Sequence, residues 1–240
     1  MARTIKIDNA LQKRFAYQSK NKNQKKEMTI HILIVCEGKK TEPNYFRSFP
    51  KKQGRFVYDL QFKGENESEE NMGGNSPKKV VEKAIELRDN SIQKFDRVWA
   101  VFDKDDFRDF DAAISKAKSY NVCCAWSNEA FELWFLLHFQ YRNTGMKRDE
   151  YQKAIEYEIN KSWKNKKKPF KYKKNALDMY DTLQKYGNQE QAIKWAQQLT
   201  QLYNDDKFST QNPRTQVYEL VKQLIGQDDE LNEEIRKGFE

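Results

Sequence analysis

The sequence contains only three cysteines and two histidines, and it has no long apolar run. No window approaches the roughly 20 apolar residues that a membrane-spanning helix needs, and the N-terminus lacks the apolar core of a signal peptide. Cys36, Cys123 and Cys124 lie in apolar segments, and the last two are adjacent. This pattern disfavours both disulfides and a cysteine-based zinc site, so we expect reduced, buried thiols in a cytoplasmic protein.

The two histidines, His31 and His138, both lie in apolar segments. We therefore expect them to have packing roles. A Ser-His-Asp triad or a histidine-metal nuclease site would need histidines elsewhere in the chain, and there are none. Any catalysis must then depend on other side chains.

The chain of 240 residues is basic, with a formal net charge of +8 at pH 7. This length suits one large domain, or a domain with a substantial extension. A basic balance favours an anionic partner, and nucleic acid is the first candidate. Residues 1–27 carry eight lysines and arginines against one aspartate and one glutamate, and residues 21–25 have no apolar period. We expect a mobile basic arm there, which could follow a phosphate backbone or could be a plain solvated leader.

Apolar, strand-like runs alternate with amphipathic helical segments between residues 28 and 140. Strands are predicted at 30–35, 55–62, 97–102 and 121–126, and helices from Thr41, from Ser76-Pro77 to about Lys94, and over 109–119. The acidic, glycine-containing segment 64–75 is predicted to be a loop. The run at 30–35 is apolar on both faces, as in a buried parallel strand. The alternation predicts an α/β fold whose mostly parallel sheet is flanked by helices.

The segment from Asn128 to Phe139 is apolar on almost every face, and its length favours a largely buried helix. Beyond residue 141 the pattern is helical and polar, with helices predicted at 149–159, 175–186 and 189–203 and a last one capped by Asn212-Pro213. The charged residues 227–240 are expected to fray. We therefore predict a helical extension over 141–226, packed on an α/β domain of 28–140.

Acidic side chains follow two of the predicted strands, at the point where each strand ends. Glu37 comes directly after the first strand, with Thr41 as the expected N-cap of the next helix, and Asp103 and Asp105 follow the strand at 97–102. Because the carboxyl ends of parallel strands meet at one edge, we expect these carboxylates to converge, with Asp103 and Asp105 alternating on an extended tip. Such a cluster needs a cation, and oxygen ligands suit Mg²⁺. The alternative is a simple turn whose glutamate points into water.

Three segments together resemble the RloB-like family, which includes AbiLii-type abortive-infection proteins. They are CEGKKTEPNYF at 36–46, SNEAFELWFLLHF at 127–139 and NPRTQVYELV at 212–221. The Glu-Gly and DxD strand tips also resemble the Toprim domain of topoisomerases, primases and OLD-type nucleases. The resemblance extends from about Met28 to Leu224. The family usually has a proline near Glu129, and its absence here puts the entry to the apolar helix in doubt.

This resemblance implies a Toprim-like core that hydrolyses nucleic acid in an anti-phage defence system, using Mg²⁺ or Mn²⁺. Glu37, Asp103 and Asp105 match the Toprim carboxylates. Glu42 corresponds to a second glutamate that helps to hold metal in OLD-like nucleases. The resemblance also implies an AAA-type ATPase as partner. Whether the substrate is DNA or RNA stays open.

Residues 161–174, KSWKNKKKPFKYKK, form a segment of eight lysines interleaved with Trp163, Phe170 and Tyr172. We call it the lysine-rich segment. Its composition suits phosphate contacts and base stacking, although a solvated charge run is the plain alternative. The candidate nucleic-acid-binding residues are Lys39, Lys40, Lys164, Lys166, Lys167, Lys168 and Lys171. Lys104, like Lys39 and Lys40, is a candidate for neutralising charge that develops on a phosphate.

Glu132 is a further catalytic candidate, because it is an acid in an otherwise apolar helix. Burying an unpaired carboxylate there would be unfavourable. It must either face the exposed side of the helix or pair with a cation in the active-site cleft.

Two other functions remain open from the sequence. A non-catalytic nucleic-acid sensor or regulatory subunit would bind without cleaving. A DxD motif after an apolar strand also serves nucleotide-sugar transferases, but those enzymes rarely need a strand-tip glutamate or so basic a chain.

Overall fold

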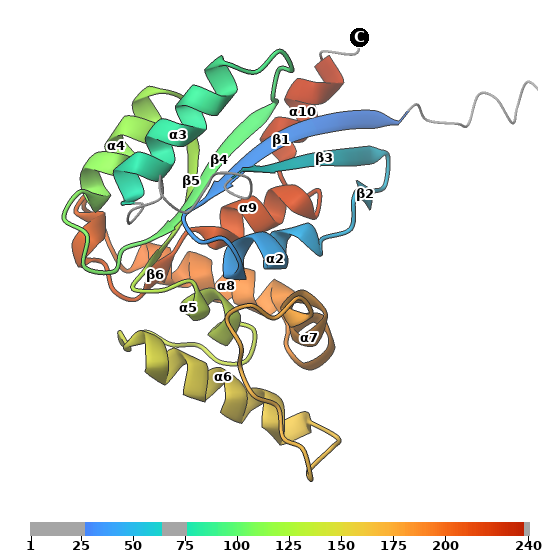
Figure 1. Ribbon diagram of the computed structural model, residues 1–240, viewed down its shortest axis with the longest axis vertical. Coiled ribbons are helices and arrows are strands. Elements are labelled where there is room, and N and C mark those ends of the chain that lie inside the picture. The colour runs from blue at the N-terminus through green and yellow to red at the C-terminus, as the bar shows by residue number, and fades with distance from the viewer. Residues whose placement is uncertain (1–26, 64–75, 238–240) are drawn as a thin grey trace, which may run out of the picture.

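The computed structural model describes residues 27–63 and 76–237 (Figure 1). The predicted basic arm, apart from Glu27, and the predicted loop at 64–75 lie outside these residues. The elements in chain order are β1 (Met28–Cys36), α2 (Thr41–Arg47), β2 (Lys52–Gln53), β3 (Phe56–Lys63), α3 (Pro77–Asp89), β4 (Arg97–Asp103), α4 (Phe110–Ser119), β5 (Cys123–Asn128), α5 (Glu132–Leu136), α6 (Arg148–Ser162), α7 (Met179–Tyr186), α8 (Gln189–Gln201), the 3₁₀ helix η2 (Phe208–Thr210), β6 (Arg214–Thr215), α9 (Val217–Leu224) and α10 (Asp229–Lys237).

The described strands form one mixed sheet in the order β2-β3-β1-β4-β5-β6. The four long strands are parallel to one another, while the short strands β2 and β6 are antiparallel and lie at the two edges. This arrangement confirms the predicted α/β fold. Because β1 and β4 are adjacent and parallel, their carboxyl ends meet at one edge of the sheet.

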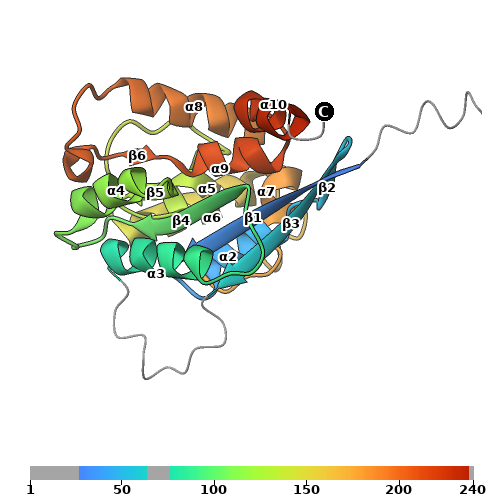
Figure 2. The same ribbon diagram turned by 90° about the horizontal axis from the view of Figure 1, so that it is seen from above.

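Alternate residues of β1 face two separate apolar cores, as the period of a strand requires. Ile30, Ile32 and Ile34 belong to the core that contains α2, α5 and α9. Leu33 and Val35 belong to the core beneath α3 and α4. Figure 1 shows α3 and α4 on one side of β1 and β4 and α2 and α9 on the other, and Figure 2 gives the same elements from above. Burial on both faces explains why the sequence of β1 is almost continuously aliphatic.

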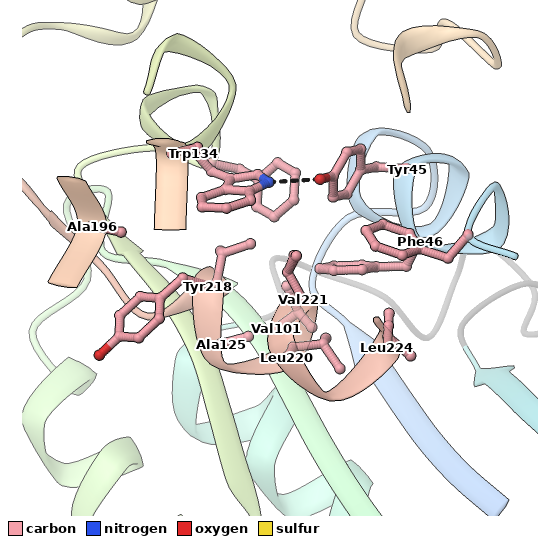
Figure 3. Packing of buried hydrophobic residues seen from close by; sticks show 14 of the residues in the cluster. Tyr45, Phe46, Val101, Ala125, Trp134, Ala196, Tyr218, Leu220, Val221 and Leu224 are labelled. Carbon is pink, nitrogen blue, oxygen red and sulfur yellow. Dashed lines mark hydrogen bonds between the residues drawn. The ribbon is translucent and has the colours of Figure 1, made fainter. Parts of the chain in front are cut away.

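The larger core is rich in aromatic rings near the end of the sheet where β1 and β4 stop. Trp134 on α5 donates a hydrogen bond of 2.8 Å from Nε1 to the hydroxyl of Tyr45 on α2 (Figure 3). Residues 130–138 are all buried, which confirms the expected burial of this segment. The predicted helix of 128–139 is wrong in extent, however, because β5 continues to Asn128 and α5 covers only Glu132–Leu136.

Several predicted helix boundaries differ from the structure, among them the start of α7, which lies at Met179 and not at residue 175. Lys40, not Thr41, is the N-cap residue of α2, and the Thr41 hydroxyl donates to the Lys174 carbonyl at 2.7 Å. Helix α3 ends at Asp89, five residues before the predicted Lys94. The Asn212-Pro213 pair does not cap a helix, because it leads into β6 and α9 begins only at Val217.

The C-terminal elements complete the sheet and its larger core. β6 pairs with the end of β5, where the Ser127 and Thr215 hydroxyls lie 2.8 Å apart. The expected fraying of the tail is wrong for α10, because Leu231 is buried and Glu234 pairs with Arg97 at 2.6 Å. No helix in the described part of the chain is long and apolar enough to cross a bilayer.

Candidate active site

A pocket of about 430 Å³ opens where β1 and β4 end. Its lining residues are Glu37, Gly38, Lys39, Lys40, Thr41, Glu42, Asp103, Asp105, Phe131, Glu132, Arg148 and Lys174. All five acidic residues that were predicted as catalytic or metal-binding therefore lie in one place. They come from three separate parts of the chain: the end of β1 with the start of α2, the end of β4, and α5.

Glu37 lies immediately after β1 and is held by backbone contacts to β4. Its N–H donates to the Val101 carbonyl at 2.9 Å, and its Oε2 accepts from the Asp103 N–H at 3.0 Å. Burial raises the pKa of this carboxyl from 4.5 to about 7, and the negative charges of Asp105 and Glu42 add to the effect. The carboxylate thus points into the pocket rather than into bulk water.

Glu42 lies in the first turn of α2, directly above Gly38. A Cβ atom at position 38 would overlap the Glu42 carboxylate, so glycine is what allows this close approach. Glu42 is buried, and burial followed by the charge of Glu132 raises its pKa. This position accounts for the Glu-Gly dipeptide and the acidic first turn as parts of one site.

Asp103 is the last residue of β4, whereas Asp105 follows in a turn with a positive φ of 37°. The prediction of an extended tip is therefore wrong, since the chain bends after Asp103. The turn still aims both carboxylates at the pocket. Asp103 is buried, and burial together with the charge of Glu42 raises its pKa well above the ordinary value. Asp106 is exposed.

Arg148, the first residue of α6, lies between the carboxylates. Its Nη2 is 2.9 Å from Asp103 Oδ2 and 2.8 Å from Asp105 Oδ1, and its Nε is 3.8 Å from Glu132 Oε2. Burial lowers the pKa of Arg148, but these three negative charges outweigh that effect and raise it. Sequence analysis missed this residue, because nothing local distinguishes it from the other basic residues near a polar helix.

Glu132 is buried and lines the pocket. Of the two positions expected for it, the structure therefore has the one in the cleft and not the one on the exposed side of the helix. Its Oε1 accepts hydrogen bonds of 3.1 Å from both Gln152 Nε2 and the Tyr172 hydroxyl. The carboxylate is therefore compensated by two neutral donors and by the more distant Arg148. Tyr172 was expected to stack on a base, whereas the structure commits its hydroxyl to Glu132.

The lysine-rich segment begins at the end of α6 and returns to the pocket. The side chains predicted to bind nucleic acid within it, Lys164, Lys166, Lys167, Lys168 and Lys171, are all exposed. Trp163 packs against Phe170 and Tyr186, at 5.4 and 5.3 Å between ring centroids, which leaves these rings partly buried. The segment is thus an anchored loop whose lysines project outward. Figure 1 shows it beyond α6, on the side of the sheet where the strands end.

Other lysines surround the mouth of the pocket. Lys39 and Lys40 are exposed at its rim, and Lys174, which sequence analysis did not single out, also lines it. Lys104 directs its Nζ to the backbone carbonyl of Asp105 at 3.0 Å. The lysine-rich segment carries a second hollow of about 990 Å³, lined by Lys167, Lys168, Lys171 and Lys173 among others. Lysines therefore extend from the rim of the acidic pocket along the lysine-rich segment.

The two histidines do not line the pocket. His138 is buried, its Nδ1 is 3.0 Å from the Trp134 carbonyl, and burial lowers its pKa to about 4. His31 is partly buried and its Nδ1 lies 3.0 Å from Asp59 Oδ2. The expected packing role fits His138, whereas His31 is partly exposed and contacts the polar side chains of Asp59 and Gln93.

The donor set suits a hard divalent cation, since carboxylate oxygens are the ligands that Mg²⁺ and Mn²⁺ prefer. Burial is the main reason that the pKa values of Glu37, Glu42 and Asp103 are raised, and the neighbouring carboxylates raise them further. As arranged, however, no three acidic, histidine or cysteine side chains among the described residues are close enough to hold a metal ion together. The chemistry of the donor set therefore fits the metal, whereas the carboxylates as they now lie, with Arg148 between Asp103 and Asp105, do not form a ligand cluster.

Comparison with known proteins identifies the family of the chain. The chain matches the family of RloB-like proteins over residues 32–224, which include the second half of β1, the DxD turn, α5 and the strand β6. No curated protein and no solved structure matches the chain significantly. The match covers well over half of the sequence. The chain therefore belongs to the RloB-like protein family.

Proposed function

We propose that this protein is a metal-dependent nuclease that hydrolyses phosphodiester bonds of nucleic acid. The observation that carries the proposal is the pocket at the strand ends, where five carboxylates converge beneath a rim of lysines. An acidic floor gathers divalent cations and a basic rim attracts phosphates, and phosphodiester hydrolysis needs both. By family resemblance, the setting is anti-phage defence in the cytoplasm alongside an AAA-type ATPase. The three cysteines, all free, suit a reducing compartment.

Glu37, Glu42, Asp103 and Asp105 would hold the Mg²⁺ or Mn²⁺. When bound, the metal would activate water and neutralise the scissile phosphate. Glu132 would act from the back of the pocket, where Gln152 and Tyr172 fix its orientation. Lys39 and Lys40 at the rim are positioned to contact phosphates beside the cleaved bond.

The lysine-rich segment would bind the nucleic acid away from the cleaved bond. Its exposed lysines lie on a loop that is fixed to the pocket by two contacts, the Tyr172 hydrogen bond to Glu132 and the Thr41 bond to the Lys174 carbonyl. A nucleic-acid strand whose phosphate backbone crosses the pocket can therefore continue along these lysines. Because Trp163 and Phe170 are engaged in packing, we assign the segment to phosphate contacts rather than to base stacking.

One observation favours a second candidate function, that of a non-catalytic nucleic-acid sensor. Arg148 already compensates Asp103 and Asp105, so the acidic residues have a partner without any metal. A sensor would bind nucleic acid through the lysines and regulate a partner without cleaving.

The test is to incubate the purified protein with Mg²⁺ or Mn²⁺ and a panel of duplex DNA, single strands and tRNA, with and without the partner ATPase. We expect metal-dependent cleavage of at least one substrate. Glu37→Gln should abolish it, whereas the matched change Asp106→Asn, at an exposed acid outside the pocket, should not. Tight binding without cleavage under every condition would favour the sensor. Cleavage that persists in EDTA would contradict the metal-dependent mechanism.

A further inference from the structure

Arg148 is in an unusual position for a cation at the start of a helix. It is the first residue of the 15-residue helix α6, where the helix dipole favours negative charge. The attraction of Asp103 and Asp105 must therefore hold it in place against that field. Its Nε is buried and has no hydrogen-bond partner among the described residues. The guanidinium therefore has two close carboxylate contacts but also one buried nitrogen without a hydrogen bond.

The side chain also has room to leave. Arg148 remains 31% exposed, while its partner Asp103 is only 8% exposed. A long side chain that is anchored at a helix end and open to solvent on one side can turn away without moving α6. The capping box at this end, in which the Lys147 N–H donates to Glu150 at 2.7 Å, does not involve the Arg148 side chain.

We propose that Arg148 is an internal counter-ion that occupies the metal-binding carboxylates in the metal-free protein, and that it turns to the substrate phosphate when metal binds. The inference rests on the proposed function and adds to it a residue and an order of events. A divalent ion carries twice the charge of a guanidinium in a smaller volume, so it competes effectively for Asp103 and Asp105. The displaced guanidinium then stays beside the pocket, where its planar fork matches two phosphate oxygens.

This arrangement would couple metal and substrate. Without Arg148 the carboxylates would repel one another in the empty pocket, and with it they stay together. Once displaced from Asp103 and Asp105, Arg148 would keep only the more distant Glu132 as a partner, and its two terminal nitrogens would be free for a phosphate. Metal binding would thus make Arg148 available as a phosphate ligand beside the metal.

The test compares Arg148→Gln with wild type and with Lys153→Gln, which removes one positive charge from the exposed face of the same helix. Lys153 pairs with exposed Asp149 at 3.0 Å. Mn²⁺ affinity is measured by calorimetry on the metal-free proteins, and cleavage is measured separately at saturating Mn²⁺. Arg148→Gln should bind Mn²⁺ on the order of tenfold more tightly, because a competing cation is gone. It should nevertheless cleave about 100-fold more slowly, because a phosphate ligand is lost. Lys153→Gln should match wild type in both.

Opposite changes in affinity and rate distinguish this role from a purely structural one, which would lower both together with the melting temperature. If Arg148→Gln fails to fold, Arg148→Lys serves instead, with a smaller gain in affinity and a partial loss of rate. Equal Mn²⁺ affinity in wild type and variant overturns the counter-ion role while leaving the nuclease proposal intact. Tighter metal binding with an unchanged rate overturns the phosphate contact. If neither protein binds Mn²⁺, both proposals are overturned. Wild-type cleavage that persists in EDTA would overturn them independently of the binding measurement.

Discussion

The acidic pocket and the lysine-rich segment are both dense in charge, but they hold it in different ways. In the pocket, Glu42, Asp103 and Glu132 are buried. In the segment, the lysines lie in solvent, and those with partners reach surface groups, as Lys171 reaches Glu156 at 3.2 Å. One region has fixed charges in a restricted space, and the other has mobile charges in water.

This difference predicts different consequences for the two regions. Salt screens exposed charges over about 8 Å at physiological ionic strength, whereas partly buried charges are screened much less. Substitutions in the pocket should therefore change chemistry and stability at any salt concentration. Substitutions in the segment should change affinity, and the change should depend on salt.

The largest effect is expected from Asp103→Asn. The substitution removes a proposed metal ligand, so cleavage should fall by more than about 100-fold, the upper end of what partners of metal ligands contribute. It should also lower the melting temperature, because Arg148 loses a buried partner that lies 2.9 Å away. Rates and thermal unfolding are measured together. A normal rate would remove Asp103 from the site.

Glu132→Gln tests whether the deepest carboxylate takes part in the chemistry. The amide oxygen can still accept from Tyr172 and Gln152, so folding should be little changed. Activity should fall by about tenfold or more if the negative charge matters. Tyr172→Phe is the matched change, since it keeps the charge and removes one donor, and its loss should be smaller. A large loss of stability with normal activity per folded molecule would mean that Glu132 is only structural.

A smaller effect is expected when Lys164, Lys166, Lys167 and Lys168 are replaced by alanine together. Each lost phosphate contact should lower the log–log slope of affinity against salt by about 0.7 to 0.9. Binding isotherms at several salt concentrations measure this slope. Lys78→Ala with Lys79→Ala, at exposed positions on α3, is the control for lost charge. An unchanged slope in the fourfold variant would leave the segment as a solvated loop.

The parts of the site that could be predicted from sequence are those placed by consecutive strand–helix units. Glu37 and Asp103 follow buried strands, and the rule that parallel strands end at one edge is sufficient to bring them together. The same alternation of strands and helices predicted that helices flank the sheet. Each strand or helix was recognised from its own short stretch of sequence, and the rule for parallel strands then joined Glu37 to Asp103 across 66 residues.

The parts that were missed depend on long-range contacts to which no such rule for parallel strands applies. Arg148 reaches Asp103 from 45 residues away, and Tyr172 reaches Glu132 from 40 residues away. The end of β5 was missed because its partner β6 lies 88 residues later, at Thr215. The spacing of apolar residues predicts helices and strands, but it does not predict which distant segments pair with each other. For the same reason the sequence showed the acids of the site but not the cation that compensates them.

The smallest effect concerns stability without metal, and it isolates the cost of burying one charge. The pKa of Glu37 is raised from 4.5 to about 7, chiefly by burial, so the folded protein favours the protonated form. The ionised carboxylate therefore lowers stability progressively as pH rises from 4.5 through 7. Glu37→Gln removes this ionisation. In EDTA its melting temperature should match wild type near pH 4.5 and exceed it by a few degrees at pH 8. Thermal unfolding at half-unit steps of pH measures the difference, with Glu190→Gln, at an exposed position on α8, run in parallel. If the difference between Glu37→Gln and wild type is the same at every pH, the Glu37 carboxylate is solvated like those of the surface. Ionising Glu37 at the end of β1 would then cost no more stability than ionising an exposed carboxyl, and Glu37 would belong with the exposed charges.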